Sequence, residues 1–151
     1  MYSFSRQFMR RIGIATAGIV LALSGLVWAA ESQETFKVRL SWVPITVAMR
    51  ATVTGSGSAT ATLSGSKLSV NGSFEGLRTP ATTATLKRGS AAGVRGKDVF
   101  DLTVSKATTG TISGSFPLDS DQIEGLKKGQ FYVQINSEKA PDGNLWGWLL
   151  R

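Results

Sequence analysis

Short stretches in which apolar and polar residues alternate, separated by glycine and proline, constrain this chain more than any other feature. Phe36, Val38 and Leu40, for example, alternate with charged residues. Successive side chains of a β-strand point to opposite faces, so this pattern predicts a strand with one buried face. The same reasoning predicts further strands at residues 47–53, 59–63, 68–74, 81–86, 99–104, 111–116, 131–135 and 145–149. Short strands at this spacing predict an all-β domain, either a β-sandwich or a β-barrel.

One short helix is expected between the predicted strands at residues 111–116 and 131–135. Asp121 and Glu124 have the spacing of a capping box, in which the two side chains accept hydrogen bonds from free amides of the first turn. Lys127 and Lys128 suit the negative end of the helix dipole, and Gly129 suits the left-handed conformation that ends a helix. The predicted fold is therefore all-β with a single short helix.

The first thirty residues have the three zones of a signal peptide. A start with three arginines and no acidic residue precedes an uncharged, mostly apolar run over residues 12–28, and small residues follow. Cleavage is expected after Ala29, with a cut after Ala30 as the second choice. The expected organisation is a helical signal peptide at residues 1–29, a short polar lead at 30–35 and one β domain at 36–151.

An uncleaved membrane anchor is the alternative interpretation of the N-terminal segment. An apolar run over residues 12–30, at about 1.5 Å of rise per residue, nearly crosses a hydrocarbon core of roughly 30 Å. Glycine, serine and threonine dilute that run, and a suitable cleavage point ends it. The sequence therefore favours export to the periplasm or the extracellular space, with no stable membrane span after cleavage.

Charge and composition narrow the function further. Without the signal peptide the chain has 14 basic and 10 acidic side chains, a net charge of +4, with no basic stripe. This charge is too small and too scattered to indicate nucleic-acid binding. The chain has no cysteine, which rules out disulfides and fits a bacterial envelope, and it has no histidine, which rules out histidine-dependent nucleophile triads.

The C-terminal stretch GQFYVQINSEKAPDGNLWG, from Gly129 to Gly147, resembles the closing motif of the CHRD domain. That domain is named for chordin and also occurs in many microbial exported proteins. FEGL at residues 74–77, TPAT at 79–82 and GVRG at 93–96 resemble its central region. The resemblance implies an immunoglobulin-like β-sandwich or barrel, distantly similar to copper/zinc superoxide dismutase. It implies no particular biochemical role.

The resemblance also draws attention to three positions at which family members commonly carry histidine. Here these positions hold Thr85, Lys87 and Asn136. A lysine ammonium repels a cation, and threonine and asparagine are poor ligands for zinc or copper. We therefore expect no metal and no other cofactor in this chain, and no superoxide dismutase activity.

Two groups of side chains are candidates for a binding surface. Trp146 and Trp148 alternate with apolar residues in the last predicted strand, and the resemblance places polar residues at their two positions, which implies that this side faces solvent. Two tryptophans on such a side would form a flat aromatic strip suited to a sugar or a protein partner. The alternative is that they pack against the first strand, for example against Trp42. Lys87 and Arg88 belong to a basic cluster suited to anionic glycans or lipid headgroups, or are simply solvated loop charges.

The function expected from these observations is a non-enzymatic exported module of the cell envelope, with a binding or structural role. Its expected partner is a glycan or an envelope protein, and nucleic acid is not expected. One alternative is an interaction protein that docks or dimerises through the strand of Trp146 and Trp148. Another is a carboxylate-dependent hydrolase, since the composition permits only Asp, Glu, Lys, Ser, Thr or Tyr chemistry.

Overall fold

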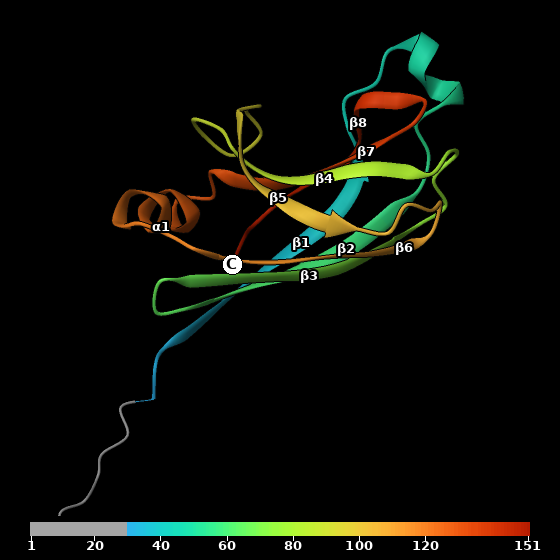
Figure 1. Cartoon of the computed structure of the whole chain (residues 1–151). Helices are drawn as coiled ribbons and strands as arrows, with labels where there is room; N and C mark the ends of the chain where they lie inside the picture. Colours follow the sequence, from blue (N-terminus) through green and yellow to red (C-terminus); the bar gives the residue numbers. More distant parts are fainter. Residues whose placement is uncertain (1–29) are drawn as a thin grey trace, which may run out of the picture.

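The computed structural model describes residues 30–151, which form a closed antiparallel β-barrel of eight strands with one α-helix (Figure 1). The predicted signal peptide lies outside the described residues. The elements are β1 (Gln33–Trp42), the 3-10 helix η1 (Val47–Ala51), β2 (Ser56–Ser64), β3 (Lys67–Glu75), β4 (Ala81–Arg88), β5 (Lys97–Val104), β6 (Gly110–Pro117), α1 (Ser120–Lys127), β7 (Phe131–Ser137) and β8 (Ala140–Trp148). The all-β prediction with one short α-helix is confirmed.

The barrel is flattened into two layers that meet at two narrow seams. Around the barrel the strand order is β1-β2-β3-β6-β5-β4-β7-β8. Only two residue pairs join β5 to β6, and two pairs plus an isolated bridge between Lys37 and Leu150 join β1 to β8. Of the two predicted architectures, the structure therefore shows the barrel and not an open sandwich, and Figure 1 shows β1, β2, β3 and β6 as one layer.

The alternating pattern places one face of nearly every strand inside the barrel. Phe36, Val38 and Leu40 of β1 are at most 2% exposed, and the residues between them are exposed. Burial of such side chains is the dominant favourable term in folding. The core is completed by residues of the other strands and of α1, among them Leu68, Val70, Phe74, Leu86, Ile112, Leu126, Phe131, Val133, Ile135, Leu145 and Leu149.

Two sequence predictions for the N-terminal half of the barrel are wrong. The segment expected to be a strand at residues 47–53 contains the 3-10 helix η1, which buries none of its own residues. Its amides bond locally, from Met49 N to Thr46 O and from Thr52 N to Met49 O, because the segment spans one end of the barrel without a strand beside it. Strand β1 begins at Gln33, inside the expected polar lead.

The α-helix begins two residues earlier than predicted. Its N-cap is Asp119, whose side chain accepts from Gln122 N at 2.8 Å, while Gln122 Oε1 accepts from Asp119 N at 3.0 Å. This is a capping box with the same spacing as the predicted one. Asp121 instead lies in the first turn and pairs with Arg88 of β4. The predicted helix end is confirmed, since Gly129 has a φ of +72°.

Strand β8 starts at Ala140, five residues before the predicted start. Its pairing with β7 shifts register between Ile135 and Ser137, so the intervening part of β8 forms a bulge. Pro141 and Gly143, with a φ of +135°, lie in this irregular part. Glycine in a strand is typical of a bulge, and proline in a strand is largely confined to edges and bulges, so neither residue gave the alternating signal of a regular strand.

Glu34 of β1 connects three parts of the fold. Its carboxylate pairs with Lys127 of α1 at 2.9 Å and with Arg151 at the chain end. The hydrogen bond from Lys127 holds the pKa of Glu34 below its usual range against the opposing effect of burial, and the charge of Arg151 also lowers this pKa.

The Glu34→Gln variant is expected to be less stable than the wild type at pH 7, and the difference is expected to shrink in acid. A carboxylate whose pKa is lowered by folding stabilises the native state above its unfolded pKa of about 4.3, and that contribution is lost as the pH falls through the folded pKa. Urea unfolding at pH 7 and near pH 3 measures this, with the exposed Glu75→Gln variant as a control. A difference that is the same at both pH values would contradict the assignment.

Candidate binding groove

Trp146 and Trp148 project from the outer face of the barrel. Leu145, Gly147 and Leu149 are buried on the inner side, whereas both tryptophans remain partly exposed. The two tryptophan side chains therefore lie on the outer side of β8.

The two indole rings form an aromatic cluster with Tyr132 of β7. The Tyr132 ring lies 4.4 Å from the Trp148 ring and 5.8 Å from the Trp146 ring, measured between centroids. The two indoles are 6.0 Å apart and inclined by 66°, so they do not form the flat strip that was expected. Their aromatic partner is Tyr132, and Trp42 instead donates its indole N–H to Gly55 O at 2.8 Å and is 52% exposed. Because the indole rings are inclined to each other, the cluster offers ring edges and parts of ring faces on the outer surface, and no continuous flat surface.

The loop between β4 and β5 contacts this aromatic cluster through Gly96 and Arg95. Gly96 N donates to the Tyr132 hydroxyl at 2.9 Å, and Tyr132 is only 1% exposed. Arg95, next to it, places its guanidinium carbon 5.4 Å from the centroid of the Trp146 ring, within the range of a cation–π contact. One side of Trp146 is thus covered by a cation that itself remains exposed.

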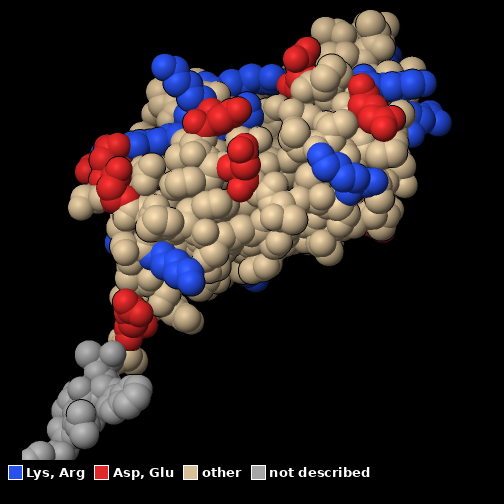
Figure 2. All heavy atoms as spheres, viewed as in Figure 1, with Lys and Arg blue, Asp and Glu red and all other residues tan. Residues whose placement is uncertain are grey.

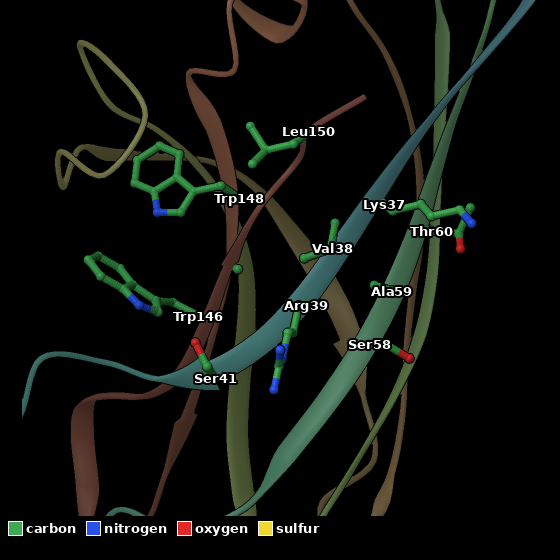
Figure 3. Close-up of a pocket in the computed structure, with 11 residues that line it drawn as sticks. Lys37, Val38, Arg39, Ser41, Ser58, Ala59, Thr60, Trp146, Trp148 and Leu150 are labelled. Atoms are coloured by element: carbon green, nitrogen blue, oxygen red, sulfur yellow. The ribbon is translucent and has the colours of Figure 1, made fainter.

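An open groove of about 590 Å³ lies beside the two tryptophans, where β1 and β2 meet β8 (Figure 3). In Figure 3 the two indole rings lie on one side of β1, and Lys37 and Thr60 lie on the other. The groove is lined by Lys37, Val38, Arg39, Ser41, Ser58, Ala59, Thr60, Trp146, Gly147, Trp148 and Leu150.

The groove follows from the narrow seam between β1 and β8. The strands pair at Ser41 and Trp146, and again through the bridge between Lys37 and Leu150, but between these points they cross without a regular ladder. Gly147 lies at the crossing, where a Cβ atom would come within 2.5 Å of Arg39 O. The close approach at this glycine brings β1 near the strand that carries the tryptophans, so that Arg39 and Ser41 line the same groove as the indole rings.

The groove is positively charged. Lys37 and Arg39 are exposed, and neither forms an ion pair among residues 30–151. In that part of the chain no acidic side chain lines the groove. Sequence reasoning missed these two cations, because basic residues on the outer face of a strand look the same whether they bind a ligand or only face water.

Lys87 and Arg88, the predicted basic cluster, are held by acidic partners. Lys87 pairs with Asp98 of β5 at 2.7 Å. Arg88 binds Asp121 of α1 at 2.5 Å, and its hydrogen bond and charge hold the pKa of that carboxyl below its usual range. Arg88 also donates to Gln130 Oε1, so it fastens the helix to β4. Figure 2 shows acidic and basic side chains close together at the left of the view and few charges over its lower middle.

The three positions associated with histidine share the outer face of the sheet formed by β4 and β7. Thr85 is opposite Gln134, Lys87 is opposite Tyr132, and Asn136 is opposite Thr83. The three positions therefore lie near one another on this face.

The side chains at this place form a row of hydrogen bonds with no resemblance to a metal site. Asn136 Nδ2 donates to Thr83 Oγ1 at 3.0 Å, and Gln134 Nε2 donates to Asn136 Oδ1 at 2.9 Å. Lys87 adds an ammonium group. Neutral amides that already bond each other, beside a cation, do not fit zinc or copper. Residues 30–151 contain no cluster of three or more acidic, histidine or cysteine side chains able to hold a metal ion.

Two smaller grooves each contain a single carboxylate. One, of about 410 Å³, lies at the ends of β2 and β3 beside Glu75, and another, of about 340 Å³, lies between β4 and β5 beside Asp101. Paired carboxylates, which glycoside hydrolysis requires, do not meet in either of them.

Among residues 30–151 no helix is both long and apolar enough to cross a membrane.

Comparison with known families gives a match that covers the whole barrel. The profile of the CHRD domain matches residues 27–149, which include all eight strands, the helix and both groove tryptophans. No curated protein and no solved structure matches the chain. With most of its length and every element of the barrel inside the match, the chain belongs to the CHRD domain family.

Proposed function

We propose that this chain is exported, with its signal peptide cleaved after Ala29, to the periplasm or the extracellular space. There its barrel acts as a non-catalytic module of the cell envelope that binds a glycan in the groove beside Trp146 and Trp148. The observation that carries the proposal is the position of two partly exposed tryptophans along an open groove of about 590 Å³.

The chemistry of the groove supports sugar binding. Tryptophan combines a large apolar surface with an N–H donor, and it is enriched among the residues that contribute most to binding. The hydroxyl groups of Ser41, Ser58 and Thr60 along the groove are able to hydrogen-bond sugar hydroxyls. An open groove with rigid aromatic groups is suited to an extended polymer.

A non-catalytic role is supported by composition. The chain has neither histidine nor cysteine, so the commonest general base and the strongest neutral-pH nucleophile are both missing. The groove beside the tryptophans is lined by hydroxyl, aromatic and basic side chains, a set that favours holding a ligand over cleaving one.

Affinity electrophoresis of the chain without residues 1–29, in gels containing soluble envelope polysaccharides, tests the proposal. Retardation by at least one polysaccharide is expected, and Trp148→Ala is expected to weaken that affinity about tenfold or more. Trp148→Phe, which keeps an aromatic ring against Tyr132, is expected to retain most of it.

Val47→Ala is the control, because Val47 is an exposed apolar residue that lines neither the groove nor the hollow beside it. Thermal unfolding of each variant separates a binding loss from misfolding, and light scattering detects dimerisation through β8. A chain that no polysaccharide retards, or that is retarded equally with and without Trp148, would exclude the proposed site.

A further inference from the structure

We infer that the ligand of this groove is an acidic polysaccharide, whose carboxylates bind Lys37 and Arg39 while its sugar rings contact Trp146 and Trp148. The inference rests on the proposed function and adds a chemical class to it. It also assigns specificity to two residues of β1, a strand about 110 positions away from the tryptophans in the chain.

Lys37 and Arg39 are placed by the strand to act together. They are two residues apart in β1 and so project from the same outer face. Their neighbours across the β1–β2 pairing are Thr60 and Ser58, whose side chains are short and uncharged. The side chains beside the two cations are therefore short and polar, which leaves room for a ligand next to Lys37 and Arg39.

Neither cation is neutralised by the protein. The ion pairs among residues 30–151 engage Lys87, Arg88, Lys127, Lys128 and Arg151, each with a carboxylate. Lys37 and Arg39 are outside this set, and no acidic side chain of the described residues lines the groove. Because clustered charges of one sign raise the local concentration of opposite charge, the groove attracts anions.

A third cation stands on the far side of the tryptophans. Arg95 lies over the Trp146 ring, 5.4 Å from its centroid, and forms no ion pair among the described residues. The aromatic groups are therefore bordered by positive charge on both sides. A uronic acid residue matches this arrangement, because its ring carries an apolar C–H face and its edge carries a carboxylate.

The length of the site favours a polymer over a small anion. A neighbouring hollow of about 410 Å³ is lined by Arg39, Ser41 and Trp42, so it shares two residues with the groove. Together the two hollows form a path from Trp148 past Arg39 to Trp42 along the outer surface. A chain of several sugar units occupies such a path, whereas an isolated anion fills only part of it.

Binding to polygalacturonate and to the same polymer with its carboxyls methyl-esterified tests the inference. The chain without residues 1–29 is expected to bind the free acid at least about tenfold more tightly than the ester. The Lys37→Gln/Arg39→Gln variant is expected to lose most of that difference and to show a weaker dependence of affinity on salt.

Lys67→Gln/Lys139→Gln is the matched control, since it removes the same charge from two exposed lysines that do not line the groove. The control is expected to bind polygalacturonate like the wild type. Equal affinity for the acid and the ester, or equal losses in both double variants, would overturn the inference and leave a neutral-glycan site standing.

Two further anionic probes are tested for binding: vesicles of phosphatidylglycerol and single-stranded DNA. Binding only to vesicles of phosphatidylglycerol, or only to single-stranded DNA, would overturn the inference in favour of another partner class. If none of the four probes binds, and no other polysaccharide retards the chain, the proposed function fails as well. The outcomes therefore separate the failure of the ligand class from the failure of the site.

Discussion

The Asn144→Ala variant is expected to lose about 2–5 kcal/mol of unfolding free energy, because it leaves buried polar groups without partners. Asn144 is fully buried in β8. Its Oδ1 accepts from Ser137 Oγ at 2.9 Å, and its Nδ2 donates to Thr54 O at 2.8 Å. These bonds tie the β7–β8 hairpin to the loop before β2, across 90 positions of the chain.

Urea unfolding of the chain without residues 1–29 measures this loss. Asn71→Ala is the control, because Asn71 is an exposed strand residue whose substitution is expected to change stability by less than about 0.5 kcal/mol. Equal stabilities of the two variants would show that the buried amide does not hold the hairpin in place.

The Gly147→Ala variant is expected to be destabilised by about 1–3 kcal/mol or more and to bind its ligand more weakly. The added methyl would lie 2.5 Å from Arg39 O and 2.6 Å from Val38 Cγ1. Since the first of these atoms belongs to the backbone, β1 has to move away from β8. That movement displaces Arg39 from the tryptophans.

Gly114→Ala is an informative comparison for this effect. A methyl there would meet the ends of the Phe116 and Leu102 side chains, which turn away more easily than a backbone carbonyl. We expect a smaller loss of stability and unchanged ligand binding, measured by urea unfolding and affinity electrophoresis. A Gly147→Ala variant that is as stable as Gly114→Ala and binds as well as the wild type would contradict the proposed close crossing.

Most of the barrel was predictable from the sequence because its strands are amphipathic. The alternation around Phe36 and Leu68 reports which face of a strand is buried, and this is a local property. Residues 47–53 show the same mixture of valine, alanine and polar residues, yet they have no neighbouring strand and form η1. Pairing partners, which decide such cases, are not visible in local sequence.

The helix start illustrates a second limit. Asp119 with Gln122 and Asp121 with Glu124 are both capping boxes at the level of sequence. The structure uses the first pair, and the second aspartate binds Arg88 of a strand more than 30 positions earlier. Local sequence does not distinguish the two possible capping boxes, and the contact between Asp121 and Arg88 is a tertiary one that local sequence does not reveal.

The candidate site was predictable only in part. Alternation placed Trp146 and Trp148 on one face of the last strand, and the family resemblance implied that this face is exposed to solvent. Their packing on Tyr132 and their 66° inclination depend on how β7 and β8 pair. Lys37 and Arg39 join the site only because the barrel closes β1 against β8. A pattern confined to one strand does not contain that information.

The indole N–H signals of the isotopically labelled chain without residues 1–29 test the central claim most directly. That chain has three tryptophans, Trp42, Trp146 and Trp148, and therefore three such signals in a nitrogen–proton correlation spectrum. Titration with oligogalacturonate is expected to shift the signals of Trp146 and Trp148 most, with smaller changes at Trp42. Shifts confined to Trp42 or to the backbone of α1, or no shift at any tryptophan, would contradict the binding of an acidic polysaccharide in this groove.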